Sequence, residues 1–188
     1  MSIKHKKMKS TKLFGNYGPT QSRRIKRTLK FISSYLNPSQ NILDLGSNNP
    51  LAEAMRNNNL NIQNTPDDLD LDLKYDIVKN DKIDVITAFE IFEHMVSPFP
   101  LLKEIKAPIL IASVPLKLWF ASAYWNEKDP YDRHYHEFEQ KQFDMLLNKA
   151  GWNVINSEKW PSEINKIGIR PILRLFTPRY YIVYCERK

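Results

Sequence analysis

Residues 41–50 read NILDLGSNNP, and they contain a short apolar run that ends in an acid and a glycine. An apolar run of this length, bounded by a turn signal, is typical of a strand buried on both faces of a parallel sheet. Gly46 has no Cβ, so the chain can turn tightly after the strand and its backbone can approach a bound ligand closely. Pro50 then favours the first turn of a helix. The stretch therefore predicts a strand, a tight loop and a helix.

The rest of the chain alternates between strand and helix patterns. Ile25, Leu29, Ile32 and Leu36 recur at helical spacing, which predicts a helix with one apolar face in front of the first strand. Alternating strands and helices predict an α/β fold in which helices cover both faces of a mainly parallel sheet. Further strands are expected at 60–64, 83–89, 108–114, 152–155 and 180–185, and further helices at 98–106 and 139–150.

The length and composition are those of one globular domain. With 188 residues, of which 42% are apolar, the chain can bury a sizeable core. Its single cysteine, Cys185, excludes an intramolecular disulfide and a cysteine-based zinc site. No apolar run approaches the roughly 18 residues that span a bilayer, and no apolar stretch follows the basic start as a signal peptide requires. We therefore expect a cytoplasmic protein.

Positive charge is concentrated near the N-terminus. The net charge is +7, yet residues 1–43 contain ten Lys or Arg and no acid, so the remainder is net negative. Residues 1–18 have low hydrophobicity and no period, which predicts a flexible basic arm in front of a single domain at 19–188. A solvated arm and a helix with a basic outer face explain this charge. The alternative is contact with nucleic acid, an anionic lipid surface or an anionic substrate, and nucleic acid is disfavoured because no aromatic platform accompanies the lysines.

Four stretches occur in an informative order along the chain. They are NILDLGSNNP, NIQNT at 61–65, DVITAFEIFEHM at 84–95 and HYHEFEQKQFDMLLNKAGW at 134–152. Together they resemble the class I S-adenosylmethionine-dependent methyltransferases, especially the group that acts on small molecules. The resemblance implies a Rossmann-like, doubly wound, mainly parallel seven-stranded sheet with an antiparallel C-terminal strand. The segment between Thr65 and Ile83 is short for a helix–strand–helix unit, so a reduced third strand is expected at 69–73.

The resemblance also implies S-adenosylmethionine as the cofactor, bound at the carboxyl ends of the strands. Because this cofactor is a sulfonium cation, an acidic and enclosed pocket suits it. Asp44 would lie near its ammonium group, Asn64 near the ribose in place of the usual acid, and Phe89 against the adenine or the methionine stem. Asp70 or Asp72 would accept a hydrogen bond from the adenine amino group, with a solvated acidic loop as the alternative. The expected cofactor-binding residues are Asp44, Gly46, Ser47, Asn64, Asp70, Asp72, Phe89, Glu90 and His94.

The loop after the first strand departs from the pattern of most relatives. Ser47, Asn48, Asn49 and Pro50 stand where further glycines are usual, so the backbone path there must differ. The same lack of glycines argues against nicotinamide, flavin and P-loop enzymes, whose backbone must reach phosphate groups at a helix N-terminus. S-adenosylmethionine carries no phosphate and does not need that cradle.

Two histidines are candidates for proton transfer from a methyl acceptor, because imidazole titrates near neutrality. His134 is the first candidate for a general base, and Tyr131 or His136 is the next. The alternative is that the loop histidines only order the helix that follows them. His134 and His136 also form a His-x-His pair, but the sequence shows no third ligand, so no metal site is predicted.

An aromatic wall is expected beside the acceptor. Trp119, Tyr124 and Trp125 follow the strand at 108–114, where they would contact an apolar or ring-bearing small-molecule acceptor, unless they pack in the core. The predicted function is methyl transfer to oxygen or nitrogen of a small metabolite, a saccharide or a lipid-linked acceptor. An in-line displacement in a dry pocket needs no obligatory acid–base pair. The alternative is an inactive methyltransferase-like module that binds RNA through the basic N-terminal segment.

Overall fold

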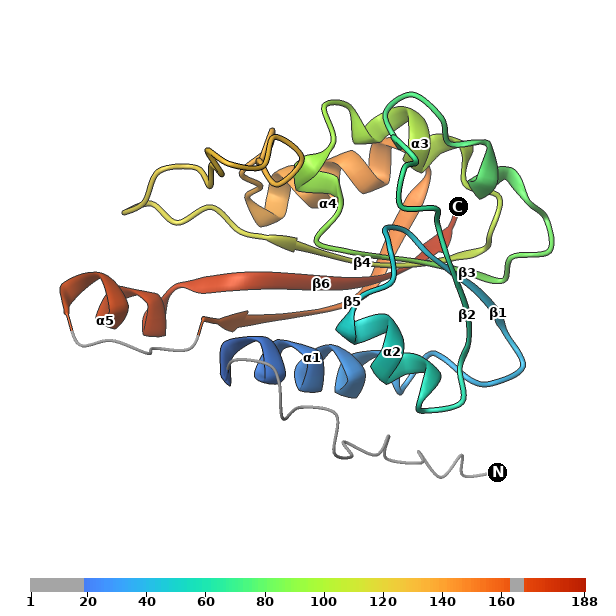
Figure 1. Ribbon diagram of the computed structural model, residues 1–188, viewed down its shortest axis with the longest axis horizontal. Helices are drawn as coiled ribbons and strands as arrows, with labels where there is room; N and C mark the ends of the chain where they lie inside the picture. The colour runs from blue at the N-terminus through green and yellow to red at the C-terminus, as the bar shows by residue number, and fades with distance from the viewer. Residues whose placement is uncertain (1–18, 163–167) are drawn as a thin grey trace.

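The computed structural model describes residues 19–162 and 168–188, which form an α/β structure around one mixed sheet (Figure 1). Within these residues the sheet has six strands in the order β2-β1-β3-β4-β6-β5. They are β1 (Asn41–Asp44), β2 (Asn61–Asn64), β3 (Val85–Phe89), β4 (Ile109–Pro115), β5 (Trp152–Pro161) and β6 (Pro178–Arg187). Strands β1 to β4 pair in parallel, and β6 runs antiparallel to β4 and β5. The predicted α/β class, mainly parallel with an antiparallel C-terminal strand, is confirmed.

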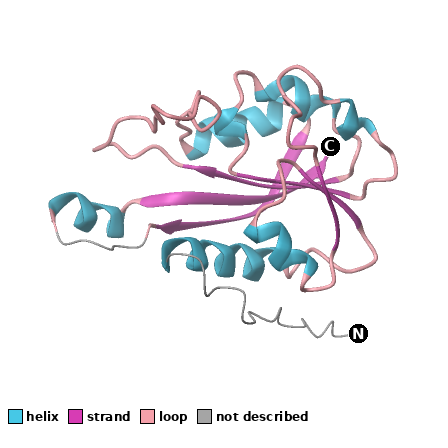
Figure 2. Ribbon diagram, in the orientation of Figure 1, coloured by secondary structure: helices cyan, strands magenta, loops and turns pink. Residues whose placement is uncertain are grey.

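Helices cover both faces of the sheet, as in a doubly wound fold. They are α1 (Pro19–Ile32), α2 (Pro50–Arg56), α3 (Pro98–Glu104), α4 (Gln140–Lys149) and α5 (Ile169–Phe176), with short 3-10 helices η2 (Asp76–Lys79) and η3 (Phe92–His94). In Figure 1, α1 and α2 lie on one face of the sheet, and α3 and α4 lie on the other. Figure 2 shows α5 at the outer end of the long β5–β6 pair, away from these two layers.

Each layer has its own apolar core. The four residues predicted to form the apolar face of the first helix are all buried, with exposed fractions of 2% for Ile25, 4% for Leu29, 0% for Ile32 and 7% for Leu36. The first three lie in α1, and they pack with residues of β1, β3 and β4. On the other face, Phe143 of α4 packs in a second cluster with residues of α3 and β6. These layers hold the carboxyl ends of β1 and β3 in place.

The predicted third strand at 69–73 is wrong, because these residues form a turn and the described sheet has six strands instead of seven. The aspartates make local hydrogen bonds instead. The N–H of Asp72 donates to Oδ1 of Asp70 at 2.9 Å, and the Asp72 carboxylate accepts from the N–H groups of Val96 and Ser97 at 2.8 and 2.9 Å. Aspartate is depleted in strands and favours such turns. In the described residues β2 is therefore an edge strand.

The last two strands are longer than predicted. Each has ten residues, and they pair from Trp152 opposite Arg187 to Pro161 opposite Pro178. Residues 155–159 of β5 are mostly polar and largely exposed, so no apolar alternation marks this half of the strand in the sequence. The pair therefore extends well beyond the core, and α5 lies at its end.

The basic arm predicted at 1–18 lies outside the described residues. In the part of the chain that the structure does describe, no helix has the length and apolar character needed to cross a membrane.

Candidate cofactor site

Asp44 ends β1 where the strand order reverses between β1 and β3, the position at which open α/β sheets bind ligands. The residue is 2% exposed. Thr87 Oγ1 donates to its Oδ1 at 2.6 Å, and Asn64 Nδ2 donates to its Oδ2 at 3.1 Å. Burial raises the pKa of Asp44 to about 7, although these hydrogen bonds and the charge of Arg56 lower it. A cationic ligand beside Asp44 would favour its charged form.

Gly46 keeps the loop after β1 close to the sheet. Its φ of +100° is in the left-handed region, which suits glycine. A Cβ at this position would lie 2.9 Å from Cδ1 of Ile91. The Gly46 N–H donates to Oγ1 of Thr65 at 2.8 Å. Both the backbone conformation and the available space therefore require glycine here.

Asn64 braces the same loop with its side chain. Its Nδ2 donates to the backbone oxygen of Gly46 at 3.2 Å as well as to Asp44, and its Oδ1 accepts from Arg56. Arg56 also donates from Nη1 to Oδ1 of Asn48 at 2.7 Å. These side-chain hydrogen bonds hold the loop after β1 in place. Asn48, which stands where a glycine is usual, therefore has a structural role.

A pocket of about 290 Å³ opens between α1, the loop after β1 and the carboxyl ends of β3 and β4. Four of the predicted cofactor residues line it, namely Gly46, Ser47, Phe89 and Glu90. Asp44 and Asn64 are hydrogen-bonded to each other and are not among the lining residues. Asp70, Asp72 and His94 are not among the lining residues. The structure therefore brings together the residues from β1, β2 and β3 but not the two loop aspartates.

Glu90 places a partly buried carboxyl in the lining of this pocket. It follows β3 with a φ of +57°, which is uncommon for a residue other than glycine. Ser113 Oγ donates to Oε1 at 2.9 Å, and Arg24 Nη1 of α1 lies 3.6 Å from Oε2. Burial raises the pKa of Glu90, although Arg24 and Ser113 oppose the shift. Arg24 was not predicted as a site residue, because the pattern of the first helix does not distinguish it from the other basic residues.

A second group of titratable side chains joins η3 to the loop between β4 and α4. The rings of His94 and His134 lie 4.9 Å apart, and the ring of Tyr124 lies 4.9 Å from that of His134. His94 Nε2 is 3.8 Å from Oε1 of the buried Glu93. Burial raises the pKa of Glu93, and the charge of Glu90 adds to this effect; burial also lowers the pKa of His94. Glu93 was not predicted as a site residue.

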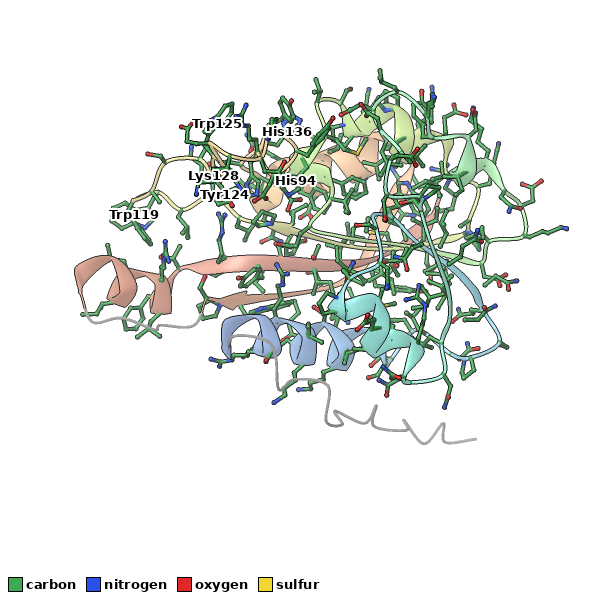
Figure 3. The ribbon with its side chains drawn as sticks, viewed as in Figure 1. His94, Trp119, Tyr124, Trp125, Lys128 and His136 are labelled. Carbon is green, nitrogen blue, oxygen red and sulfur yellow. The ribbon has the colours of Figure 1, made fainter. Side chains whose placement is uncertain are left out.

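The predicted aromatic wall is exposed to solvent. Trp119, Tyr124 and Trp125 have exposed fractions of 73%, 42% and 55%, so the alternative that they pack in the core is wrong. Arg133 lies over the Trp125 ring at 4.4 Å. In Figure 3, Trp119 stands apart from Tyr124, Trp125 and His94. These rings therefore form an open surface along the loop.

The three predicted proton-transfer residues lie in different surroundings. Tyr131 is 90% exposed. His136 Nε2 lies 3.2 Å from the backbone oxygen of Val96, and its ring stacks on Phe138. Only His134 lies against His94 and Tyr124, with its side chain 8% exposed.

Replacing Asp72 by alanine distinguishes a structural role from a cofactor role. We expect the variant to lose about 1–2 kcal/mol of unfolding free energy, because two N–H groups ahead of α3 lose a charged acceptor. Affinity for S-adenosylhomocysteine should stay unchanged, because Asp72 does not line the pocket. Chemical denaturation and calorimetry measure the two quantities, with exposed Asp67→Ala as the control. A tenfold loss of affinity at unchanged stability would restore Asp72 to the cofactor site.

The doubly wound sheet, with a pocket at its switch point lined by Glu90 and Arg24, matches the fold of the class I methyltransferases. Residues 17–157 match the methyltransferase domain family. The chain therefore belongs to the methyltransferase domain family. No curated protein matches the chain in sequence.

Solved structures share the fold at low sequence identity. A chain of the complex between the Haloferax volcanii Trm112 methyltransferase activator and a methyltransferase is similar, with a TM-score of 0.62 and 16% identity, over 89% of this chain and 92% of that one. An Archaeoglobus fulgidus SAM-dependent methyltransferase has a TM-score of 0.58 and 14% identity, over 88% and 94%. A Mesorhizobium loti enzyme of the same description has a TM-score of 0.53 and 15% sequence identity, and the match covers 94% of this chain and 100% of that one.

Proposed function

We propose that the pocket beneath α1 holds S-adenosylmethionine and that the chain transfers its methyl group to oxygen or nitrogen of a small acceptor. The main support for this proposal is a pair of carboxyls, the buried Asp44 and the partly buried Glu90, whose pKa values are both raised by burial. A ligand that brings a sulfonium and an ammonium group would add to the positive charge that Arg24 places beside Glu90, and it would favour the charged forms of both carboxyls.

The charges around the pocket orient the cofactor. Its ammonium group lies against Glu90 in the pocket wall, with the buried carboxyl of Asp44 beyond the lining residues, and its carboxylate points towards the guanidinium of Arg24, which can bind it through charge-assisted hydrogen bonds. Phe89 packs against the adenosine. A pocket of about 290 Å³ is at the lower end of the range for ligand sites, about 300–1,000 Å³, so part of the cofactor extends along the open rim towards Asn64.

The acceptor binds on the side of the loop between β4 and α4. Trp119, Tyr124 and Trp125 expose ring faces there, and such faces suit a ring-bearing or apolar acceptor, including the apolar part of a saccharide or a lipid-linked intermediate. Methyl transfer is an in-line displacement, so positioning of the acceptor against the sulfonium supplies much of the rate enhancement.

Transfer of a labelled methyl group tests the acceptor class. Purified protein is incubated with methyl-labelled cofactor and with separate small-molecule, lipid, RNA and protein fractions. We expect label in the small-molecule or lipid fraction, and Trp125→Ala should reduce the transfer. Label found only in RNA or protein would contradict the proposed acceptor.

Removal of residues 1–18 tests the alternative of an RNA-binding module. The residues proposed to bind the cofactor lie at position 24 and beyond, so the truncated protein should keep its melting temperature and its affinity for S-adenosylhomocysteine within about twofold. Binding to RNA should be weak for both proteins at about 150 mM salt. Tight, salt-sensitive RNA binding that disappears on truncation would favour the alternative, and a large loss of cofactor affinity would show that these residues belong to the cofactor site.

A further inference from the structure

Two imidazoles and one carboxyl converge beside the cofactor pocket. Glu93 and His94 belong to η3, which begins one residue after the pocket-lining Ile91, and His134 comes from the loop between β4 and α4. One ligand atom from each of the three side chains lies within 4.8 Å of the others. The backbone holds the two segments together, because the N–H groups of Tyr135 and His136 both donate to the backbone oxygen of Glu93, at 2.8 and 3.2 Å.

The carboxyl of Glu93 lacks a full set of partners. The residue is 1% exposed, and its Oε2 has no hydrogen-bond partner among the described residues. A buried carboxylate oxygen without a partner is costly, whereas a bound cation would satisfy it. The other oxygen of this carboxyl, Oε1, lies 3.8 Å from Nε2 of His94, so a cation bound to the Glu93 carboxylate would be within reach of that imidazole.

Both imidazoles are oriented in the way that metal-binding histidines usually are. A backbone oxygen can only accept, so His94 must donate from Nδ1 to the oxygen of Arg133, 3.1 Å away. His134 Nδ1 lies 3.0 Å from Oε1 of Glu137, and Arg179 holds the other oxygen of that carboxylate at 3.3 Å. Bonds of this kind at one ring nitrogen leave the other nitrogen unprotonated for a metal. In both residues that nitrogen is Nε2.

We propose that Glu93, His94 and His134 bind a divalent transition metal ion, with Zn²⁺ the best match to two imidazoles and one carboxylate. Two histidines and a glutamate are a recurrent set in catalytic zinc sites, which keep a fourth position open. Nitrogen and oxygen ligands of a tetrahedral zinc ion lie about 3.3–3.6 Å apart, so the side chains need to close in by up to about 1.5 Å. The His-x-His pair considered in the sequence is not the site, because His136 faces Val96.

The open position would face the acceptor region, next to Glu90 of the cofactor pocket. A metal there would bind an acceptor hydroxyl and lower its pKa. The hydroxyl proton would pass to solvent, its oxygen would take the methyl group, and the cofactor sulfur would keep the bonding electrons as a thioether. This use of the ion rests on the proposed function, and it gives His134 the role of a ligand instead of a base. Metal binding itself does not depend on the function.

Zinc titration of the full-length protein, stripped with chelator and free of cofactor, tests the proposal. We expect one Zn²⁺ per chain and a higher melting temperature with zinc, because an ion that binds only the folded state stabilises it. Glu93→Gln, which keeps the size of the side chain, and His134→Ala should each weaken zinc binding by more than about 100-fold. His136→Ala should keep the affinity of the wild type. Mg²⁺ should bind far more weakly, because it prefers oxygen ligands.

Equal zinc affinity in the wild type and Glu93→Gln would overturn the proposal, as would a loss in His136→Ala as large as that in His134→Ala. S-adenosylhomocysteine binding to the metal-free protein is measured in parallel. Absent zinc binding with intact cofactor binding would contradict only the metal site, and the reverse result would contradict only the cofactor pocket.

Discussion

Replacing Gly46 by valine is expected to lower the affinity for S-adenosylhomocysteine by more than about 100-fold, or about 2.8 kcal/mol. A side chain at this position would meet Ile91 at 2.9 Å and would extend into space that the ligand needs. A β-branched residue also resists a φ of +100°, so the loop would move away from Thr65. Calorimetry on the folded variant measures the loss.

Gly151→Val is the matched control for this variant. Gly151 also has a positive φ, +93°, but it follows α4, away from the pocket. Both substitutions should therefore lower the melting temperature, whereas only Gly46→Val should abolish cofactor binding. Equal affinities in the two variants would mean that the loop after β1 is not part of the cofactor site.

Asp44→Asn is expected to weaken binding of S-adenosylmethionine about 10–100-fold at pH 8, because a buried charged partner of the ammonium group is lost. The asparagine keeps an oxygen that can accept from Thr87, so the fold should persist. Asp84→Asn is the control, since its carboxylate accepts from the N–H of Asn41 at the other end of β1. An unchanged affinity in Asp44→Asn would remove Asp44 from the site.

Because the pKa of Asp44 is raised, the difference in cofactor affinity between the wild type and Asp44→Asn should depend on pH. In the native state its pKa is about 7, against a usual value of 3.8, so the native carboxyl stays protonated where the unfolded one is ionised. The contribution of Asp44 to the stability of the cofactor-free protein therefore falls as pH rises from about 4 to 7, and it is constant above that range. Affinity for the cationic cofactor should rise through pH 7 in the wild type and rise less in Asp44→Asn, in which only Glu90 of the two carboxyls remains to ionise. A flat wild-type profile would contradict this role of Asp44.

The central part of the fold and site could be predicted because its signals are local. The apolar run that ends at Asp44 and the glycine two residues later specify a buried strand and a tight turn within a few residues. The apolar positions of α1 are specified by their spacing. The third strand was predicted from a resemblance, and it failed because Asp70 and Asp72 satisfy backbone N–H groups in a turn and ahead of α3.

The residues that the sequence did not reveal act through partners that are distant along the chain. Thr87 bonds Asp44 across 43 positions, and Thr65 bonds Gly46 across 19. Arg24 reaches Glu90 only because α1 packs over the ends of the strands. Such pairs leave no local sequence pattern, because the two partners lie far apart along the chain and no regular spacing connects them.

Calorimetric titration of the wild-type protein with S-adenosylhomocysteine tests the cofactor pocket most directly. We expect one site per chain, with binding lost in Gly46→Val and retained in Gly151→Val. No binding at millimolar ligand, with the protein shown to be folded, would contradict the assignment of this pocket to the cofactor.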